Sequence, residues 1–325
     1  MKTRIIGTGA YLPKRVMTNR DLKGMVDTTE TWILERTGIR ERRIADESEA
    51  ASDLAIPAAR RALEMARLNE KDLDLIMVAT ITPDMFFPST ACLVQDRLGA
   101  HQAAAFDLSA ACSGFLYALS VADQYIRNGV YKNVLIIGTE VMSRIVDWTD
   151  RNTCVLFGDG AGAAVLQRTK SDHGVLATHL HSDGRLWDLI QVPGGGSRIP
   201  PSPEMLAERK PYIKMKGNET FKVAVRTLEE AVYETLKSAH VQPSDISLLV
   251  PHQANLRIIQ AVAQRLGLSM EKVVLNVDRY GNTSAASIPI ALDEAVRQGR
   301  VKDGDLILFE AFGAGLTWAS ALVRW

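Results

Sequence analysis

Short apolar runs alternate with longer amphipathic stretches along this 325-residue chain. The runs have the length and composition of buried strands, and the stretches carry apolar residues three and four positions apart, as helices do. This alternation predicts an α/β protein whose strands are buried. The expected strands are residues 73–81, 103–110, 133–141, 246–252, 272–277 and 305–312.

The later part of the chain repeats features of the earlier part. Residues 70–76 resemble residues 243–249, and Arg-Leu-Gly at 97–99 recurs at 265–267. An Ala-Leu pair that precedes an Arg-x-Gly helix end also recurs, and all three matches are offset by about 170 residues. The repeat predicts two similar halves, residues 1–170 and 171–325.

Early in the second half, residues 182–217 are rich in Gly, Pro and polar side chains. Such a composition predicts a long surface connection. At the boundary between duplicated halves, we expect this connection to cover a pocket.

Composition and charge exclude several classes of protein. Hydrophobic residues make up 46% and charged residues 23%, as in globular proteins. Lys plus Arg and Asp plus Glu number 38 each, so no overall field favours nucleic acid or an anionic membrane. No apolar run approaches the ~20 residues that span a bilayer, and the N-terminus lacks the features of a signal peptide. We therefore expect a cytoplasmic protein without nucleic-acid or membrane partners.

The three cysteines lie far apart without a CxxC pair, so neither a disulfide framework nor a metal site is indicated. Cys112 lies where an expected strand ends and a helix begins. A thiol at that junction meets free backbone N–H groups and the positive end of the helix dipole, which stabilise the thiolate. A buried structural cysteine is the alternative.

Two further polar residues follow the same logic. His252 comes directly after an expected strand, at the kind of loop where α/β proteins bind ligands. Asn282 lies in the segment that matches the Cys112 junction in the repeated half. A histidine satisfied at a helix start and an Asn helix cap are the alternatives. A thiol, an imidazole and a carboxamide at corresponding loop ends predict one shared site.

These segments resemble β-ketoacyl-[acyl carrier protein] synthase III of bacterial type II fatty acid synthesis. The resemblance runs from residue 1 to 325 and is carried by the Cys112 junction and residues 157–163, 251–255, 280–285 and 312–318. It implies a thiolase-like five-layered α-β-α-β-α sandwich made of two duplicated halves. It also implies a homodimer that uses a coenzyme A thioester as substrate and needs no cofactor.

The resemblance implies a decarboxylative condensation. Cys112 would take an acyl group from an acyl-CoA primer, normally acetyl-CoA, before malonyl carrier protein loses carbon dioxide. Because an Asn amide does not titrate, a Cys-His-Asn set favours decarboxylation over proton abstraction. His252 and Asn282 would then donate hydrogen bonds to the developing enolate. The thiolase pattern, by contrast, has a second catalytic Cys, and it has a His where this chain has Asn282.

The resemblance also assigns roles around this centre. The N–H groups of Cys112 and Gly315 would bind the oxyanion of the tetrahedral intermediate. Ala314 and Ala319 replace glycines that are common in the family, and Ala314 would be strained if its φ were positive.

Coenzyme A is expected at Trp32, Arg36, Arg151 and Asn255. The acidic carrier protein is expected at Gln253, Ala254, Asn255, Leu256 and Arg257. The acyl pocket is expected at Phe87, which would cross the dimer interface, and Phe157.

Other functions remain as hypotheses at this stage. They are a related synthase of secondary metabolism and a non-catalytic acyl- or carrier-binding protein of the same fold. A papain-like cysteine hydrolase is less favoured because its histidine is oriented differently. Residues 158–162 resemble a phosphate loop, but no Lys-Ser/Thr follows, so we expect these glycines to permit tight packing instead.

Overall fold

Two β-sheets form the framework of the protein in this computed structural model, which describes residues 1–325. The first sheet has the order β1-β7-β6-β4-β5 and the second β11-β12-β13-β8. The first consists of β1 (Lys2–Tyr11), β4 (Leu75–Ala79), β5 (Ala104–Leu108), β6 (Asn133–Val141) and β7 (Asp159–Thr169). The second consists of β8 (Gly174–Ser182), β11 (Leu248–Pro251), β12 (Leu306–Gly313) and β13 (Thr317–Arg324).

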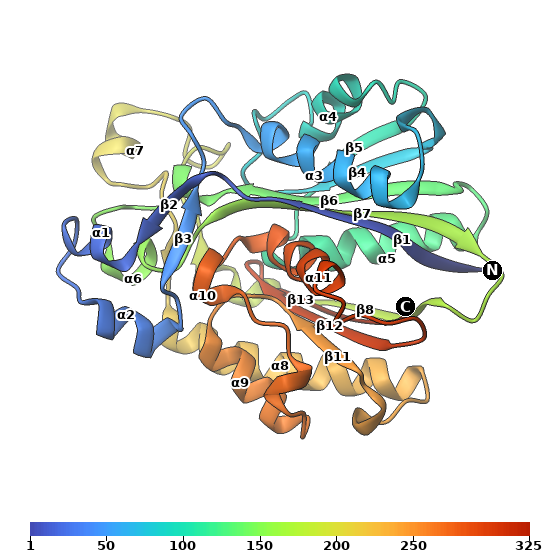
Figure 1. Cartoon of the computed structure of the whole chain (residues 1–325). Helices are drawn as coiled ribbons and strands as arrows, with labels where there is room; N and C mark the ends of the chain where they lie inside the picture. Colours follow the sequence, from blue (N-terminus) through green and yellow to red (C-terminus); the bar gives the residue numbers. More distant parts are fainter.

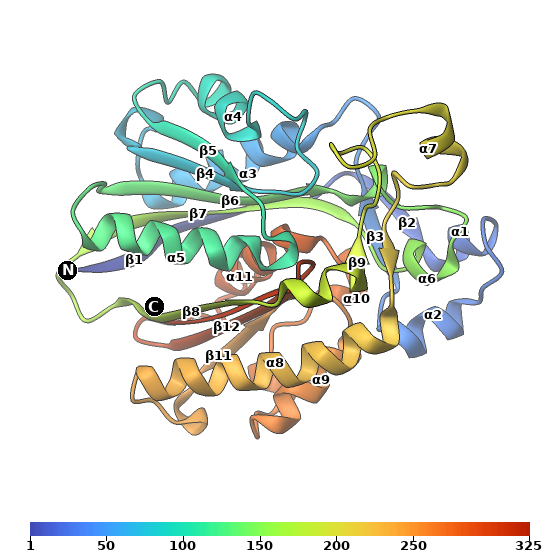
Figure 2. The same cartoon turned by 180° about the vertical axis from the view of Figure 1, so that it is seen from behind.

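Helices separate the two sheets and cover their outer faces (Figures 1 and 2). The first sheet is covered by α3 (Ala51–Ala66) and α4 (Thr90–Leu98). Between the sheets lie α5 (Gly114–Arg127) and α11 (Ser287–Arg297), and the second sheet is covered by α8 (Gly217–Ser238) and α9 (Leu256–Arg265). The expected five-layered α-β-α-β-α sandwich is confirmed.

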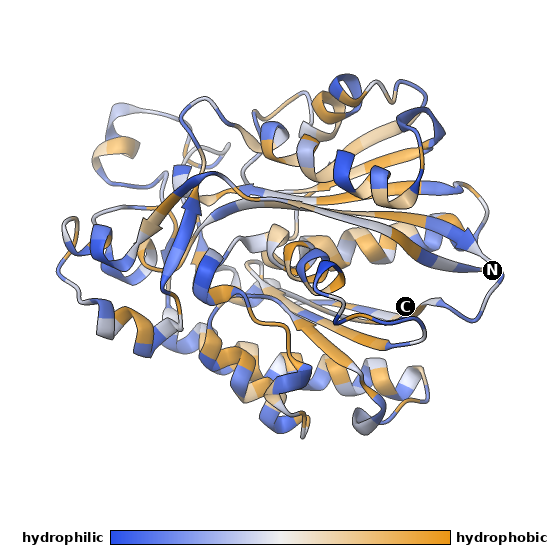
Figure 3. Cartoon of the chain, viewed as in Figure 1, coloured by the Kyte–Doolittle hydropathy of each residue, from blue (hydrophilic) through white to orange (hydrophobic).

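The apolar residues lie where these layers meet. Figure 3 shows hydrophobic residues along the strands and on the helices between the sheets. The largest buried cluster joins α5 and α11 to the inner faces of both sheets, and two others lie under the outer helices. Burial of these faces is the main favourable term in folding. No helix of the chain is both long and apolar enough to cross a membrane.

The remaining elements gather beyond one end of the sandwich (Figure 1). They pack partly through a smaller apolar cluster. They are β2 (Arg15–Thr18), α1 (Asn19–Lys23), α2 (Glu30–Thr37), β3 (Glu41–Ile44), α6 (Arg151–Cys154), β9 (Ile190–Gln191), α7 (Pro203–Ala207), β10 (Lys214–Met215) and α10 (Val277–Tyr280).

The duplication extends to the backbone of two tight turns. A short 3₁₀ helix precedes α5 at Ala111–Ser113 (η2), and another precedes α11 at Ser284–Ala286 (η7). Ala111 has φ 46° and Ser284 has φ 49°, a region that residues other than Gly rarely adopt. Strained turns at matching positions persist because the surrounding structure determines them, and they tend to occur at functional sites.

One expected strand was wrong, and the long connection in the second half contains short elements. Residues 272–277 do not form a strand and make only one bridge, between Leu249 and Val273. The buried Gln253 side chain instead accepts hydrogen bonds from the N–H groups of Asn276 and Val277, which a fifth strand would have used. Residues 182–217 form the expected connection, which contains β9, α7 and β10, with β9 paired to β10, and Ile190, Ile213 and Met215 from it line a cavity.

Glycines allow the layers to approach closely beside the turns. A Cβ at Gly138 would lie 2.2 Å from the Ala285 carbonyl oxygen, and one at Gly162 would lie 2.6 Å from the Ile290 nitrogen. Real Cβ atoms do not occupy such positions. The expectation that glycines near residues 158–162 serve packing is therefore confirmed.

Candidate active site

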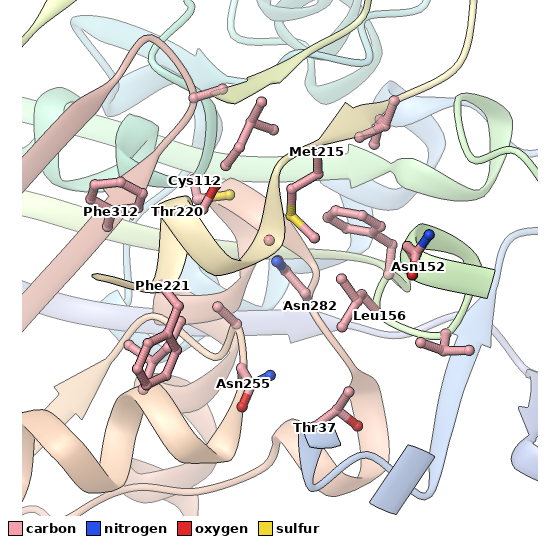
Figure 4. Close-up of a pocket in the computed structure, with 18 of the residues that line it drawn as sticks. Thr37, Cys112, Asn152, Leu156, Met215, Thr220, Phe221, Asn255, Asn282 and Phe312 are labelled. Atoms are coloured by element: carbon pink, nitrogen blue, oxygen red, sulfur yellow. The ribbon is translucent and has the colours of Figure 1, made fainter. Parts of the chain in front are cut away.

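A cavity of about 730 Å³ opens at the end of the sandwich where β5 and β11 finish. Cys112, His252 and Asn282 all line it. Cys112 comes from η2, His252 follows β11, and Asn282 immediately precedes η7. Figure 4 shows the Cys112 sulfur and the Asn282 side-chain nitrogen directed toward the same space. Three residues far apart in the sequence therefore meet in one chamber.

The Cys112 thiol is less acidic than its place before α5 predicts. Burial raises its pKa to about 12, and the nearby Glu140 carboxylate adds to the rise. A hydrogen bond with Ser284 lowers the pKa but does not offset the burial. Desolvation of a charge in a protein interior outweighs the partial charge of a helix end. The expectation of a stabilised thiolate in the resting protein was wrong, and the thiol carries its proton.

His252 is held as a neutral imidazole. Burial lowers its pKa to about 3, because the charged ring would lose its hydration. Its Nδ1 lies 2.6 Å from Ser287 Oγ, and the Gln253 N–H donates to the same oxygen at 3.4 Å. His252 Nδ1 is the only acceptor within hydrogen-bond distance of the buried Ser287 hydroxyl, so the hydroxyl donates its hydrogen to Nδ1. The single ring hydrogen is then on Nε2, the other ring nitrogen.

Asn282 has its amide orientation determined by the backbone. The Ser284 N–H donates to Asn282 Oδ1 at 2.8 Å, and a backbone N–H can only donate. The oxygen must face Ser284, so the Nδ2 hydrogens face the cavity. The Asn282 N–H also donates to the Leu156 carbonyl, and its own carbonyl accepts from Gly158 N–H. The side-chain amide is therefore held as a hydrogen-bond donor toward the cavity, and backbone hydrogen bonds hold the residue itself in place.

The Gly-rich turn between β12 and β13 lies against the nucleophile. A Cβ at Gly313 would lie 2.7 Å from the Cys112 nitrogen, so only Gly fits there. Gly315 has φ 136°, a conformation that favours Gly. Ala314 lines the cavity and is not among the residues with positive φ, so it causes no strain in this turn.

Comparisons with known proteins agree over the whole length. Residues 106–184 match the family described as 3-Oxoacyl-[acyl-carrier-protein (ACP)] synthase III, and residues 236–325 match its C-terminal part. Beta-ketoacyl-[acyl-carrier-protein] synthase III of Caldanaerobacter subterraneus subsp. tengcongensis is 56% identical, covering 99% of this chain and 97% of that protein. The chain belongs to the β-ketoacyl-[acyl-carrier-protein] synthase III family.

Solved structures of this synthase III family have the same fold. The crystal structure of 3-oxoacyl-[acyl-carrier-protein] synthase III from Aquifex aeolicus is 54% identical, with a TM-score of 0.93 over 99% of this chain and 100% of that one. The priming β-ketosynthase of the R1128 polyketide biosynthetic pathway is also similar. It is 37% identical, with a TM-score of 0.92 over 99% of this chain and 96% of that one.

At the mouth of the cavity, the structure groups the residues that the synthase III resemblance assigned to coenzyme A. Trp32 and Arg36 on α2 line the cavity, as does Asn255. The Arg151 guanidinium lies 4.8 Å from the centre of the Trp32 ring, although Arg151 itself does not line the cavity. Asn255 Nδ2 donates to the Arg36 carbonyl at 3.0 Å and so joins the α9 start to α2.

The segment expected to bind a carrier protein divides into surface and interior positions. Arg257 is exposed, with its guanidinium 5.7 Å from the centre of the Phe221 ring. Ala254 lines the cavity, and Leu256 packs against Gly38. The assignment of Gln253 to the carrier protein is corrected. Gln253 is 1% exposed, and its amide joins Pro251 and Val274 to the turn before α10.

The two phenylalanines expected in the acyl pocket lie in different environments. Phe157 is buried, lines the cavity and pairs with Asn282 through a backbone bridge. Phe87 is 84% exposed and does not line the cavity of its own chain.

Sequence reasoning missed three polar residues beside the centre. Ser287 orients His252, Ser284 contacts Cys112, and Glu140 accepts a hydrogen bond from Ser284 at 3.0 Å. The repeat register placed Ser284 opposite Ala111 and could have drawn attention to it. Glu140 had no such signal, because a carboxylate inside an apolar strand shows its environment only after folding. No group of three or more His, Cys, Asp or Glu side chains could hold a metal ion.

Proposed function

We propose that this chain condenses an acyl-CoA primer, normally acetyl-CoA, with malonyl-[acyl carrier protein]. The products are 3-oxoacyl-[acyl carrier protein], carbon dioxide and coenzyme A, and the reaction initiates fatty acid biosynthesis. The observation that supports it most strongly is the meeting of one thiol and two fixed hydrogen-bond donors in a single cavity.

In the first half of the reaction, Cys112 attacks the thioester carbonyl of the primer and coenzyme A leaves. The backbone N–H groups of Cys112 and Gly315 would bind the oxyanion of this step, and the close approach of Gly313 to the Cys112 nitrogen supports this role. Removing one such donor slows acyl-transfer enzymes by about 100- to 1000-fold. Only the acyl group remains, as a thioester on Cys112.

In the second half, a malonyl thioester loses carbon dioxide and becomes an enolate. The His252 Nε2–H and the Asn282 Nδ2–H donate to the thioester oxygen as its charge develops. Neither residue needs to accept a proton, because the departing carboxylate leaves the electron pair that attacks the acyl carbon. A neutral imidazole suits this role, and the lowered pKa of His252 keeps the ring neutral across the physiological pH range.

The outer part of the cavity is suited to the carriers of both substrates. The Trp32 ring offers a face for an adenine, while Arg36 and Arg151 offer cations for phosphate groups. Arg257, exposed at the mouth, is suited to an acidic carrier protein. Phe87 would complete the acyl pocket of a second copy in a homodimer.

The first test follows the acyl group. Acetyl-CoA labelled in the acetyl group should acylate the full chain, and mass spectrometry of its peptides should locate the label on Cys112. A Cys112→Ala variant should take up no label, whereas a Cys92→Ala variant should be labelled normally, since Cys92 lies outside the cavity. Labelled protein should then release 3-oxoacyl carrier protein when malonyl carrier protein is added.

Each failure in this test has its own meaning. Acylation without condensation would indicate an acyl-binding protein of this fold, and loss of the acyl group to water would indicate a hydrolase. Condensation with other primers but not with acetyl-CoA would favour a related synthase of secondary metabolism.

A further inference from the structure

The Cys112 thiol must lose a proton before it attacks, and neither of its catalytic partners can accept one. His252 already has its hydrogen on Nε2, with Nδ1 occupied by Ser287. The Asn282 amide does not titrate. The inference below rests on the proposed acyl transfer and concerns the group that receives this proton.

Glu140 is a buried carboxylic acid that the proposed mechanism leaves unused. It lies near the end of β6 and is 0% exposed. Its carboxylate accepts hydrogen bonds from Thr82 Oγ1 at 2.6 Å, Thr80 Oγ1 at 3.2 Å and Ile81 N at 3.2 Å. The fourth donor is Ser284 Oγ at 3.0 Å. All four donors are neutral, so no cation hydrogen-bonds to the carboxylate to stabilise its charge.

Ser284 lies between this carboxylate and the nucleophile. Its turn η7 packs against η2, which carries Cys112, and its hydroxyl donates its single hydrogen to Glu140 Oε1. The hydroxyl therefore has its lone pairs free for the thiol hydrogen. The strained backbone at Ser284, φ 49°, presents it to η2, which packs directly against η7.

We propose that Glu140 accepts the proton of Cys112 through the Ser284 hydroxyl during acyl transfer. The thiol proton moves to Ser284 Oγ while the Ser284 hydroxyl proton moves to Glu140 Oε1. The sulfur lone pair forms the bond to the acyl carbon, and the bond from that carbon to the coenzyme A sulfur breaks. The coenzyme A thiolate leaves through the cavity and takes a proton from solvent.

The same path returns the proton after condensation. The enolate attacks the acyl group, the tetrahedral intermediate collapses, and Cys112 departs as a thiolate. The proton held on Glu140 then returns through Ser284 to the sulfur. Over the whole cycle, Glu140 gains and loses one proton, and one solvent proton ends on coenzyme A.

This route is favoured because it does not increase the number of buried negative charges. A thiolate formed by loss of its proton to solvent would add a second negative charge beside the Glu140 carboxylate, which is costly in a low-dielectric region. Transfer through Ser284 moves a single negative charge and adds none. Burial raises the pKa of Glu140 to about 7, so its carboxyl can exchange a proton near neutral pH.

Few other titratable groups face Glu140. The turns packed against its side of β6 contribute Cys112 from η2, while η7 contributes only the neutral Ser284. Its cross-strand neighbour on β7 is Gly160. Asp159, the next residue of β7, directs its carboxylate to Ala45 N and Ser143 instead.

The test measures thiol reactivity and acyl transfer separately against pH. Alkylation of Cys112 by iodoacetamide, located by mass spectrometry, reports the thiolate without any coenzyme A or carrier protein. Acetylation by acetyl-CoA reports the proposed reaction. The variants are Glu140→Gln and Ser284→Ala, and the matched control is Glu310→Gln, which alters another fully buried glutamate whose pKa burial raises to about 8.

In the unmodified chain, both rates should rise with pH through a limb near pH 7 that follows ionisation of Glu140. Each variant should lose this limb, and acetylation at pH 7.5 should fall by about 100-fold. Glu140→Asp should recover part of the limb. Glu310→Gln should keep the profile of the unmodified chain.

Two results would overturn this proton-transfer route. If Glu140 acted only as a fixed negative charge, Glu140→Gln would lower the thiol pKa and speed alkylation at neutral pH, which would overturn the proposal. An unchanged profile for Ser284→Ala would also overturn it. That variant should fold, because Ala111 adopts φ 46° at the matching turn. Failure of the proposed function would abolish acetylation in every variant but leave the alkylation profiles readable.

Discussion

The hydrogen positions at three side chains decide what this site can do. His252 and Asn282 are donors because their other polar atoms face Ser287 and the Ser284 N–H. The direction at Asn282 is fixed because a backbone N–H can only donate, and the direction at His252 follows from the Ser287 hydroxyl, which has Nδ1 as its acceptor. A pair of donors of which neither serves as a base suits decarboxylation better than proton abstraction from carbon.

The His252 tautomer can be tested through Ser287. Ser287→Ala removes the donor to Nδ1, so the ring hydrogen can move from Nε2 and the enolate loses a donor. We expect condensation to slow by about 100-fold while acetylation of Cys112 continues. Separate assays of acetylation and of malonyl decarboxylation measure the two steps.

The control for this variant is Ser120→Ala, which removes another helix hydroxyl paired with a side chain, that of Thr178. Neither step should change in the control. Equal slowing of both steps in Ser287→Ala would contradict an effect on His252 alone.

Among the elements, the two duplicated turns place the chemistry. η2 and η7 precede α5 and α11, and the sheets bring them face to face at the layer between them. The contact is close because Gly138 on β6 presents no side chain to Ala285. A strand residue outside the site therefore determines how near β6 and the turn that carries Ser284 approach each other.

Gly138→Ala should disturb this contact. The added Cβ would meet the Ala285 carbonyl oxygen at 2.2 Å, and backbone cannot move aside as a flexible side chain can. We expect the free energy of unfolding to fall by about 3 kcal/mol, measured by urea denaturation. Gly184→Ala, where no atom lies within 4 Å of the new Cβ, should change stability by less than about 0.5 kcal/mol. Equal stability of the two variants would refute the close contact.

On the scale of the whole molecule, zero net charge leaves recognition of an acidic partner to local cations. Arg257 is exposed at the mouth of the cavity that holds Cys112. The same cavity therefore extends from the surface at Arg257 to the Cys112 thiol.

Arg257→Glu should weaken the encounter with malonyl carrier protein. We expect the KM for that substrate to rise by about tenfold at low salt, and the difference to shrink as salt screens it. Lys132→Glu makes the same charge change at an exposed residue just before β6 that does not line the cavity, and it should leave the KM unchanged. A similar rise in both variants would show that only the total charge matters.

A second whole-molecule prediction concerns the exposed aromatic pair. Phe86 and Phe87 are 83% and 84% exposed, which is unusual for neighbouring large apolar side chains. We expect a homodimer that covers them, detectable by sedimentation velocity. Phe87→Asp should shift the protein toward monomer, whereas Trp187→Asp, at another exposed aromatic, should not.

Much of the molecule could be predicted from its sequence. The alternation of apolar runs predicted an α/β protein and the offset repeat predicted two similar halves, since local patterning reflects which faces are buried, whereas the five-layered sandwich came from the family resemblance. Cys112, His252 and Asn282 could be predicted because each follows a strand or precedes a helix. Strand 272–277 was wrongly predicted because its apolar pattern could not show that Gln253 takes the backbone N–H groups there.

What the sequence determined by itself was the fold class, the repeat and the three residues of the centre. Only the tertiary structure decided their ionisation, because pKa values depend on burial and on neighbours that are distant along the chain. It made the thiol and the imidazole neutral, moved Gln253 from the surface to the interior, and placed Glu140 behind Ser284. Sequence specifies which groups are present, and packing specifies which of them carry protons.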